Sequence, residues 1–301
     1  MIEFPPIFDV NYYRNSYPEL RIYSDAAVAR HYEKYAEKQG RTCCVYDIAD
    51  NLKRMMNETI ARYPISVLEL GPFDNPSCID ISDNHKVKYF DVLDSEELKL
   101  RAEKLNRPFK NVPNKIDYVS PTGDLTIVNE KFDIVFSCHS IEHQMNLVKH
   151  LNIVENLLKD QGLYVLIIPD KRYCYDHYVP ETTVTEIIDN YINDITFRPL
   201  SHVLQEHFMR AKNSAFDHWM GEHGDFEEDI DSDKLSKVVE EYLLNRKEGK
   251  YIDVHSLRFT PHSFENIINT LNKVKLIKLQ NYRLCHTVWG RLEFTAVLRK
   301  P

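Results

Sequence analysis

The stretch that decides the fold is VLELGPFDNP, residues 67–76. A β-rich run ends close to the acidic residue Glu69, and two residues later Gly71 permits a tight turn. Asp91 follows Gly71 by twenty residues and stands at the end of the next predicted strand, residues 87–90. Where such strands are parallel neighbours, the glycine lets the backbone approach a ligand, and the acid accepts hydrogen bonds from two ribose hydroxyls. The spacing therefore predicts a nucleotide-type site at the carboxyl edge of a parallel sheet.

The phosphate-binding part of a dinucleotide site is incomplete in this stretch. The G-x-G-x-x-G fingerprint would need glycines at the positions of Phe73 and Pro76. A pyrophosphate needs the close backbone approach that those glycines allow, so the sequence disfavours a dinucleotide. The pattern favours a ligand that carries a ribose but no phosphate.

Predicted strands and helices alternate from about residue 45 onward. Periodicity predicts a helix over residues 48–61 and another from Leu147 to Gly162, where the glycine closes it. Strands are predicted at residues 65–70, 87–90, 116–119, 132–137 and 163–168. Thr260 caps a helix that begins at Pro261, and two final strands are predicted at residues 274–282 and 291–298, joined by a turn containing Gly290. This alternation predicts an α/β fold with a doubly wound, mostly parallel, Rossmann-like sheet.

Two regions depart from the alternation. Residues 1–43 are rich in tyrosine and predict two short helices with an aromatic seam, ending near Gly40. This segment is too small to hold a core alone, so we expect a small helical module that packs on a main domain of residues 44–301. Residues 176–250 predict a helical insertion after the fifth strand. We expect it to cover the ligand edge of the sheet as an acceptor lid.

Composition disfavours several classes of protein. The formal charge is −8, which argues against nucleic acid as the main partner. The longest strongly apolar run, residues 163–168, is far shorter than the roughly 20 residues of a membrane span, and the first residues lack the pattern of a secretion signal. The six cysteines form no C-x-x-C pair. We expect a cytoplasmic protein without a disulfide framework.

The motifs resemble those of class I S-adenosylmethionine-dependent methyltransferases. Glu69, Gly71 and Asp91 carry the resemblance together with FDIVFSCHSIEH at residues 132–143, LLKDQG at residues 157–162 and EFTAVLRK at residues 293–300. The match covers about residues 50–175 well and residues 255–300 more loosely. The segments PDKRYCYD, residues 169–176, and HSLRFTPHSF, residues 255–264, are similar to bacterial methyltransferases of surface-polysaccharide biosynthesis. Residues 8–41 resemble a tyrosine-rich module of glycan-handling bacterial proteins.

The resemblance implies a cofactor, S-adenosyl-L-methionine, and a role for each matching residue. Its binding residues would be Glu69, Gly71, Pro72, Asp91, Asp124, Ser137 and His139. Glu69 would hold water or the methionine amine, Asp91 the ribose hydroxyls, and Asp124 the adenine amine. The candidate catalytic bases are His139, His143 and His255, because an imidazole accepts a hydroxyl proton at neutral pH. The candidate acceptor-binding residues are Asp170, Arg172, Tyr173 and Asp176. The implied partner is a sugar or glycan acceptor, with homo-oligomers or glycan-synthesis enzymes as candidate partners of residues 1–43.

Other interpretations stay open. The acceptor could instead be a nitrogen atom or a small phosphorylated metabolite, or the fold could serve a non-catalytic binding protein. The histidines and the loop acids could have purely structural roles. The pairs His202–His207 and His218–His223 are each five residues apart, whereas one helical face needs three or four. The sequence therefore predicts no metal site.

Overall fold

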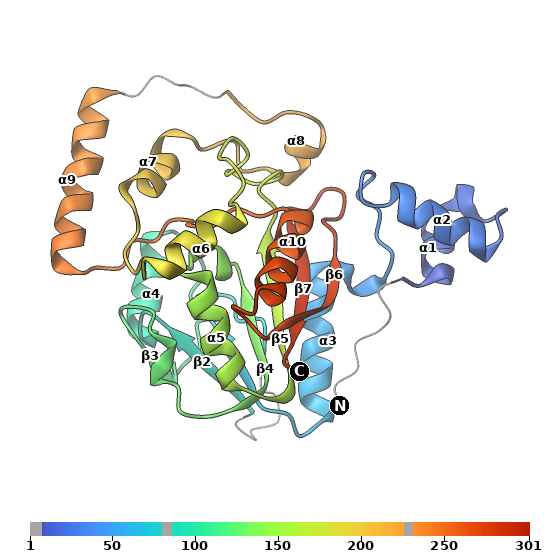
Figure 1. Ribbon diagram of the computed structural model, residues 1–301, viewed down its shortest axis with the longest axis horizontal. Helices are drawn as coiled ribbons and strands as arrows, with labels where there is room; N and C mark the ends of the chain where they lie inside the picture. Colours follow the sequence, from blue (N-terminus) through green and yellow to red (C-terminus); the bar gives the residue numbers. More distant parts are fainter. Residues whose placement is uncertain (1–7, 80–85, 226–230) are drawn as a thin grey trace.

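A seven-stranded sheet forms the centre of the computed structural model, which describes residues 8–79, 86–225 and 231–301 (Figure 1). The strand order is β3-β2-β1-β4-β5-β7-β6, and only the pairings of β7 with β5 and β6 are antiparallel. The strands are β1 (Val67–Leu70), β2 (Val87–Asp91), β3 (Tyr118–Val119), β4 (Phe132–Cys138), β5 (Leu158–Pro169), β6 (Gln280–Cys285) and β7 (Glu293–Arg299). The predicted fold class, a mostly parallel doubly wound α/β sheet, is confirmed.

The chain leaves β1 toward β2 on one side and later returns to β4 on the other. Such a reversal opens a crevice at the carboxyl ends of the two central strands, where open α/β sheets bind their ligands. The stretch at residues 67–76 lies at this point, as the sequence predicts.

Helices cover both faces of the sheet because each buries an apolar stripe against it. Helix α3 (Ala49–Arg62) lies on one face and buries Leu52, Met56 and Ile60. Helices α5 (Leu147–Leu157) and α10 (Pro261–Lys273) contribute to the core of the other face, together with Ile187 of α6 (Val184–Ile192). Helix α10 begins as predicted, because the Thr260 side chain accepts the Ser263 N–H and Pro261 occupies the first turn.

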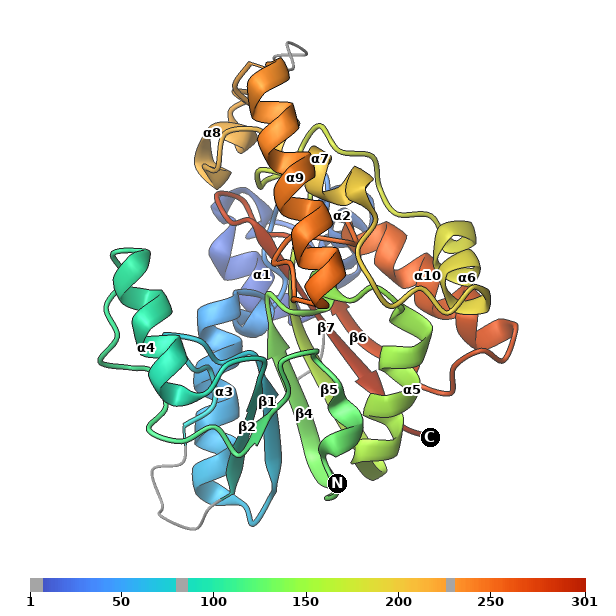
Figure 2. The ribbon, with the colours of Figure 1, turned by 90° about the vertical axis from the view of Figure 1, so that its left-hand side faces the viewer.

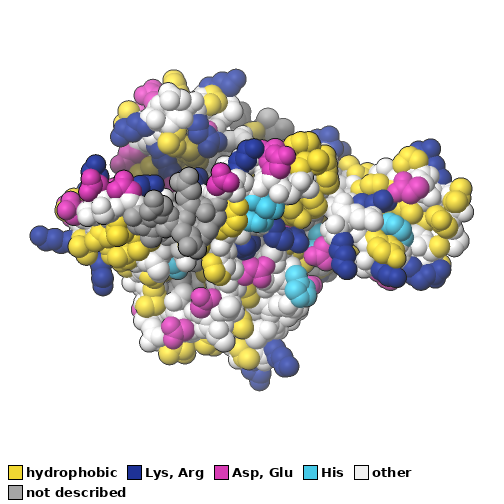
Figure 3. Space-filling model, turned by 90° about the horizontal axis from the view of Figure 1, so that it is seen from above, with side chains coloured by type: hydrophobic (Ala, Val, Ile, Leu, Met, Phe, Trp, Pro, Cys, Tyr) yellow, Lys and Arg dark blue, Asp and Glu magenta, His cyan; other side chains and the backbone are white. Residues whose placement is uncertain are grey.

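Helices of the region 176–250 lie above the sheet (Figures 1 and 2). They include α7 (Leu200–Phe208), α8 (Ala215–Trp219) and α9 (Ser232–Glu248). On the face seen from above, acidic and basic side chains are interspersed (Figure 3). Among the described residues no helix is both long and apolar enough to span a bilayer. The acidic run of residues 225–233 lies partly outside the described residues.

The N-terminal segment contains the two predicted helices, α1 (Val10–Ser16) and α2 (Asp25–Tyr35), and projects to one side (Figure 1). Its small core is aromatic, with Tyr13 fully buried. Gly40 fastens the segment to the rest of the chain, since its carbonyl accepts the Trp289 N–H at 2.8 Å. A Cβ atom on Gly40 would lie 2.6 Å from the Trp219 ring, so this contact needs glycine. The domain boundary at residue 43 stays a prediction.

Two predicted element boundaries are wrong. Helix α5 ends at Leu157 rather than at Gly162, because Leu158 already pairs with Phe132 as the first residue of β5. The pairing register shifts after it, and Gln161 takes a left-handed conformation (φ 63°) within the irregular start of the strand. Strand β6 begins at Gln280 rather than at residue 274, since α10 continues to Lys273 and a connection follows.

Candidate functional site

Gly71 and Asp91 occupy neighbouring positions at the carboxyl edge of the sheet. Leu70 pairs with Phe90 in the parallel register, so the next residue of each strand comes to the same edge. Gly71 is exposed and has φ +69°. Leaving out its two chain neighbours, a Cβ there would meet only Ser140 within 4 Å in the described part of the chain, at 3.8 Å. The backbone is therefore accessible, and Gly71 takes a conformation that glycine adopts readily.

Asp91 directs a buried carboxylate to this edge. The residue is 6% exposed, and one of its oxygens accepts the Leu93 N–H at 3.2 Å. Burial raises the pKa of Asp91 to about 6, although hydrogen bonds from backbone N–H groups oppose the rise. A carboxylate at this edge is suited to accept hydrogen bonds from ligand hydroxyls, because they would replace the water that burial removed.

Glu69 lies beneath the loop that follows β1 instead of at its surface. The side chain is 1% exposed, and its two oxygens accept the Ser77 N–H at 2.7 Å and the Cys78 N–H at 2.8 Å. Burial raises the pKa of Glu69 to about 7 despite these bonds. Glu69 thus shapes the loop, and Pro72 inside that loop is also buried. Glu69 therefore supports the loop after β1 from below, and Gly71 is the exposed residue at this edge.

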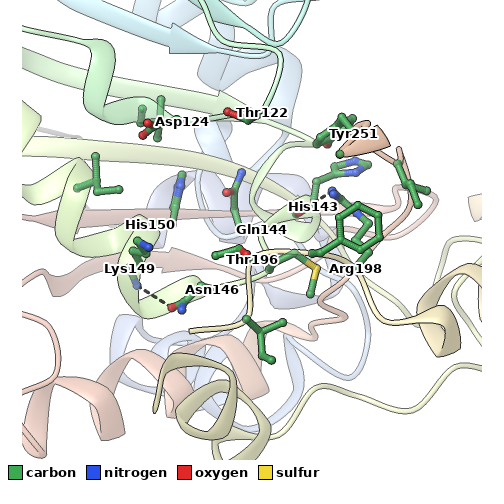
Figure 4. Close-up of a pocket in the computed structure, with 18 of the residues that line it drawn as sticks. Thr122, Asp124, His143, Gln144, Asn146, Lys149, His150, Thr196, Arg198 and Tyr251 are labelled. Atoms are coloured by element: carbon green, nitrogen blue, oxygen red, sulfur yellow. Dashed lines mark hydrogen bonds between the residues drawn. The ribbon is translucent and has the colours of Figure 1, made fainter. Parts of the chain in front are cut away.

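Asp124 lies in a loop that is tied to the end of β2, where the Ser120 N–H donates to the Asp91 carbonyl at 3.0 Å. Its side chain is exposed and accepts the N–H and hydroxyl of Thr126. Asp124 lines a cavity of about 560 Å³ (Figure 4). The walls come from residues 122–126, 143–153, 195–198 and 249–252. The helical insertion therefore supplies part of the cavity.

Ser137 faces the protein interior, away from the carboxyl edge. It is 1% exposed, and its hydroxyl lies 3.2 Å from the Tyr164 hydroxyl, which in turn lies 2.9 Å from His150 Nε2. Side chains alternate along a strand, and this position points toward α5. The Ser137 hydroxyl is therefore not positioned for the predicted contact with the cofactor.

The three candidate catalytic histidines gather around one buried carboxylate, that of Glu142. Glu142 Oε1 lies 3.9 Å from His139 Nδ1, 3.8 Å from His143 Nε2 and 3.7 Å from His255 Nε2. His255 is brought here from a distant part of the chain, because the N–H groups of Ser256 and Leu257 both donate to the Glu142 carbonyl, at 2.7 and 2.9 Å.

The three histidines have different surroundings. The His139 side chain is 37% exposed at the end of β4, with an uncommon φ of 50°. Burial lowers the pKa of His143 to about 4, against the opposing charge of Glu142. Burial alone would lower the pKa of His255. The charge of Asp176 and its hydrogen bond, 2.5 Å between Oδ2 and His255 Nδ1, outweigh burial, so the pKa of His255 is raised. His139 is the most accessible of the three.

The predicted acceptor-binding residues divide into two pairs. Asp170 is fully buried and accepts from Arg172 and the Thr287 hydroxyl, and buried Asp176 bridges His255 and Arg258. These acids brace the loop after β5. Both carboxylates are buried and already bound to protein groups, so their positions do not suit a direct contact with the acceptor.

Arg172 and Tyr173 form the other pair and stay partly exposed. The Tyr173 ring stacks on Trp219 of α8 at 3.9 Å, with the two planes 8° apart. This stack joins the loop after β5 to the helical insertion.

Sequence reasoning missed Glu142, although it lies inside the quoted segment at residues 132–143. Its neighbour His143 could be recognised as a candidate because histidine is a common catalytic base. A single glutamate next to it has no spacing or pattern that indicates a functional role.

Sequence reasoning also misplaced His218 and His223. Helix α8 ends at Trp219, and the chain turns through Gly221 (φ 85°), so the two Nδ1 atoms lie 2.8 Å apart. The ring of His177 stacks on His223 at 3.8 Å. The argument from helical spacing was wrong for this pair because the two residues are not on one helix.

No protein-family model and no curated protein matches this chain. Among solved structures, it is similar to 1,6-didemethyltoxoflavin-N1-methyltransferase of Burkholderia thailandensis (12% identity, 91% of this chain, 88% of that chain, TM-score 0.41). It is also similar to the CcbJ methyltransferase of Streptomyces caelestis (12% identity, 84% and 94%, TM-score 0.40). A third is the CurJ carbon methyltransferase (9% identity, TM-score 0.39), where the match covers 91% of this chain but 58% of the other.

Proposed function

We propose that this protein is an S-adenosylmethionine-dependent methyltransferase that acts on a hydroxyl group of a sugar. The observation that carries the proposal is the pairing of exposed Gly71 with the buried acid Asp91 at the switch point of the sheet. A ribose-bearing ligand without phosphates suits this pair, because Phe73 and Pro76 replace the glycines that a pyrophosphate would need.

The residues present fit this cofactor. Apart from the two chain neighbours of Gly71, only Ser140 among the described residues comes within 4 Å of its Cβ position, so a ligand can lie against the backbone there. Asp91 would accept the ribose hydroxyls, and Asp124 would accept the adenine amine from a loop tied to the same strand end. When bound, S-adenosylmethionine supplies an electrophilic methyl group on a sulfonium. The protein's own contribution is mainly to hold the two reactants in line.

His139 is the best-placed base for a hydroxyl acceptor. It precedes Ser140, the residue beside Gly71, and so lies close to the edge where the cofactor would bind. Its side chain is partly exposed, and its Nε2 lies 3.4 Å from Glu293 Oε1. The carboxylate would hold the imidazole in place and stabilise the imidazolium that forms when His139 takes the hydroxyl proton.

The cavity lined by His143 and Asp124, next to the proposed position of the adenine, supports a polyhydroxylated acceptor, although His139 is not among its lining residues. Its volume of about 560 Å³ is in the usual range of small-molecule pockets. Its lining includes many groups that can form hydrogen bonds with hydroxyls: Thr122, Gln144, Asn146, Lys149, Thr196, Arg198 and Tyr251 (Figure 4). The hydroxyls of a sugar need hydrogen-bond partners of this kind. We place the reaction in surface-polysaccharide synthesis, because residues 169–176 and 255–264 resemble methyltransferases of that process.

Calorimetry tests the proposal directly. The purified protein is titrated with S-adenosylmethionine, S-adenosylhomocysteine and NAD, and the titrations are repeated on Asp91→Asn. We expect micromolar binding of the first two ligands only, weakened at least about 100-fold in the variant. Asp160→Asn is the matched control, since Asp160 is an exposed acid in the irregular start of β5. Binding of NAD alone, or equal binding by Asp91→Asn, would contradict the proposed cofactor.

A further inference from the structure

The carboxylate of Glu142 is buried without a hydrogen-bond partner. Its side chain is 1% exposed, yet among the described residues neither oxygen accepts a hydrogen bond. Burying a carboxylate is unfavourable unless a cation or several donors compensate it. The nearest nitrogens, those of His143 and His255, lie 3.8 and 3.7 Å from Oε1, which is too far for a hydrogen bond. A cation bound between these groups would compensate the buried carboxylate.

Both imidazoles are oriented so that Nε2 faces Glu142. His255 Nδ1 makes a hydrogen bond of 2.5 Å with Asp176 Oδ2, whereas His143 Nδ1 lies 3.3 Å from Asp253 Oδ1 without forming one. In the neutral imidazole of His255, the carboxylate at Nδ1 places the proton there and leaves the lone pair on Nε2, which is the usual arrangement behind a metal-bound histidine. The two rings are nearly perpendicular, at 87°.

We propose that Glu142, His143 and His255 bind a divalent transition-metal ion of the zinc and manganese class. The three ligand atoms all lie within 4.8 Å of one another. Ligands at 2.0–2.1 Å from a tetrahedral ion are about 3.4 Å apart, so the two distances from Glu142 Oε1, 3.8 and 3.7 Å, must shorten by a few tenths of an ångström, and the two histidine nitrogens must approach each other by at most about 1.4 Å. Two imidazoles and one carboxylate suit zinc, manganese or iron(II) better than magnesium, which prefers oxygen ligands.

The surroundings offer an entry path and further ligands. His143 lines the 560 Å³ cavity, so an ion reaches it from solvent. The Tyr175 hydroxyl lies 2.8 Å from His255 Nε2, the atom that would bind the ion. Its side chain must therefore rotate away from Nε2 when the ion binds. His139 Nδ1, 3.9 Å from Glu142 Oε1, approaches from the side of Gly71. An open position between them would take the acceptor hydroxyl and ease loss of its proton, and this last role rests on the proposed function.

The test uses the full chain after removal of metals with a chelator. Zinc chloride, manganese chloride and magnesium chloride are titrated separately by calorimetry, and cobalt chloride is followed by visible absorbance. We expect one zinc or manganese ion per chain with a micromolar or lower Kd, and magnesium at least about tenfold weaker. Glu142→Gln should lower the affinity at least about 100-fold, and His143→Gln serves if that variant does not fold.

His177→Asn is the matched control, because it alters the other cluster of His177, His218 and His223 and keeps a side chain that can donate to the Arg172 carbonyl. Its zinc affinity should equal that of the unchanged protein. Absence of a stoichiometric ion, unchanged affinity in Glu142→Gln, or loss in His177→Asn would overturn the site.

Titration of the metal-free protein with S-adenosylmethionine separates the two proposals. If the metal-free protein binds S-adenosylmethionine but takes up no zinc or manganese in the separate metal titrations, only the metal site is overturned. If it takes up the ion but does not bind S-adenosylmethionine, only the proposed function is overturned.

Discussion

Replacing Asp91 with asparagine should strengthen the fold while it weakens the binding of cofactor. Burial raises the pKa of this carboxyl from an ordinary 3.8 to about 6, so the ionised form is unfavourable in the folded protein. At about 1.4 kcal/mol per pH unit, this rise corresponds to about 3 kcal/mol. This figure already includes both the effect of burial and the opposing effect of the backbone hydrogen bonds. In the variant, the asparagine oxygen can still accept the Leu93 N–H.

The sign of the pH dependence follows from the raised pKa. Well below pH 3.8 the carboxyl is protonated in both the folded and the unfolded chain, so the raised pKa does not affect stability there. Between pH 3.8 and about 6 the unfolded chain ionises while the folded protein stays protonated, so the folded protein loses stability relative to the variant, and above about pH 6 this loss is complete. The advantage of Asp91→Asn should therefore be about 3 kcal/mol at pH 8 and about 1 kcal/mol at pH 4.5.

Thermal unfolding at the two pH values measures this effect. At about 2 °C per kcal/mol for a chain of this size, the variant should melt about 5 °C higher at pH 8 and about 2 °C higher at pH 4.5. The same preparation should bind S-adenosylmethionine at least about 100-fold more weakly, because hydrogen bonds to a charged acceptor are lost. Equal melting temperatures at pH 8, or a gain that does not shrink with acid, would refute the reasoning.

Three further substitutions test the site and its support. Gly71→Ala has room beside Ser140 but forces a left-handed backbone on alanine, so we expect a loss of about 1–2 kcal/mol in thermal unfolding and weaker cofactor binding in calorimetry. His139→Asn should lower turnover by about 10²–10⁴-fold in a methyl-transfer assay while the cofactor Kd stays unchanged, and full turnover would exclude it as the base. Gly40→Ala should destabilise the protein by about 1–3 kcal/mol, because its Cβ would collide with Trp219; an unchanged melting temperature would show that this contact is not rigid.

The edge of the sheet was predictable because its determinants are local in the sequence. A strand, an acid and a glycine within a few residues place Gly71 at a turn, and the next strand ends at Asp91. In a parallel sheet, pairing of neighbouring strands then brings the two together without further information. The cap of α10 at Thr260 was predictable for the same reason, since capping depends on the four consecutive residues 260–263.

Side-chain direction was harder to predict. Ser137 is the penultimate residue of β4 and lies close to the correct edge, but alternation points its side chain toward α5 and into a hydrogen bond with Tyr164. Glu69 has the right spacing from Gly71, yet its carboxylate bonds to the loop above it. Spacing along a strand gives the edge that a residue reaches, and only packing decides whether its side chain is free for a ligand.

By itself the sequence determined the alternation of strands and helices and the meeting of Gly71 with Asp91 at the carboxyl edge of the sheet, whereas the order of the strands came from the structure. Only the tertiary structure decided that Glu142 would be buried among histidines that come from two distant segments, and that His218 and His223 would meet across a turn. The physical reason is range. Periodicity, caps and turns act over a few residues, whereas the position of His255 depends on two backbone hydrogen bonds to Glu142, more than a hundred residues away.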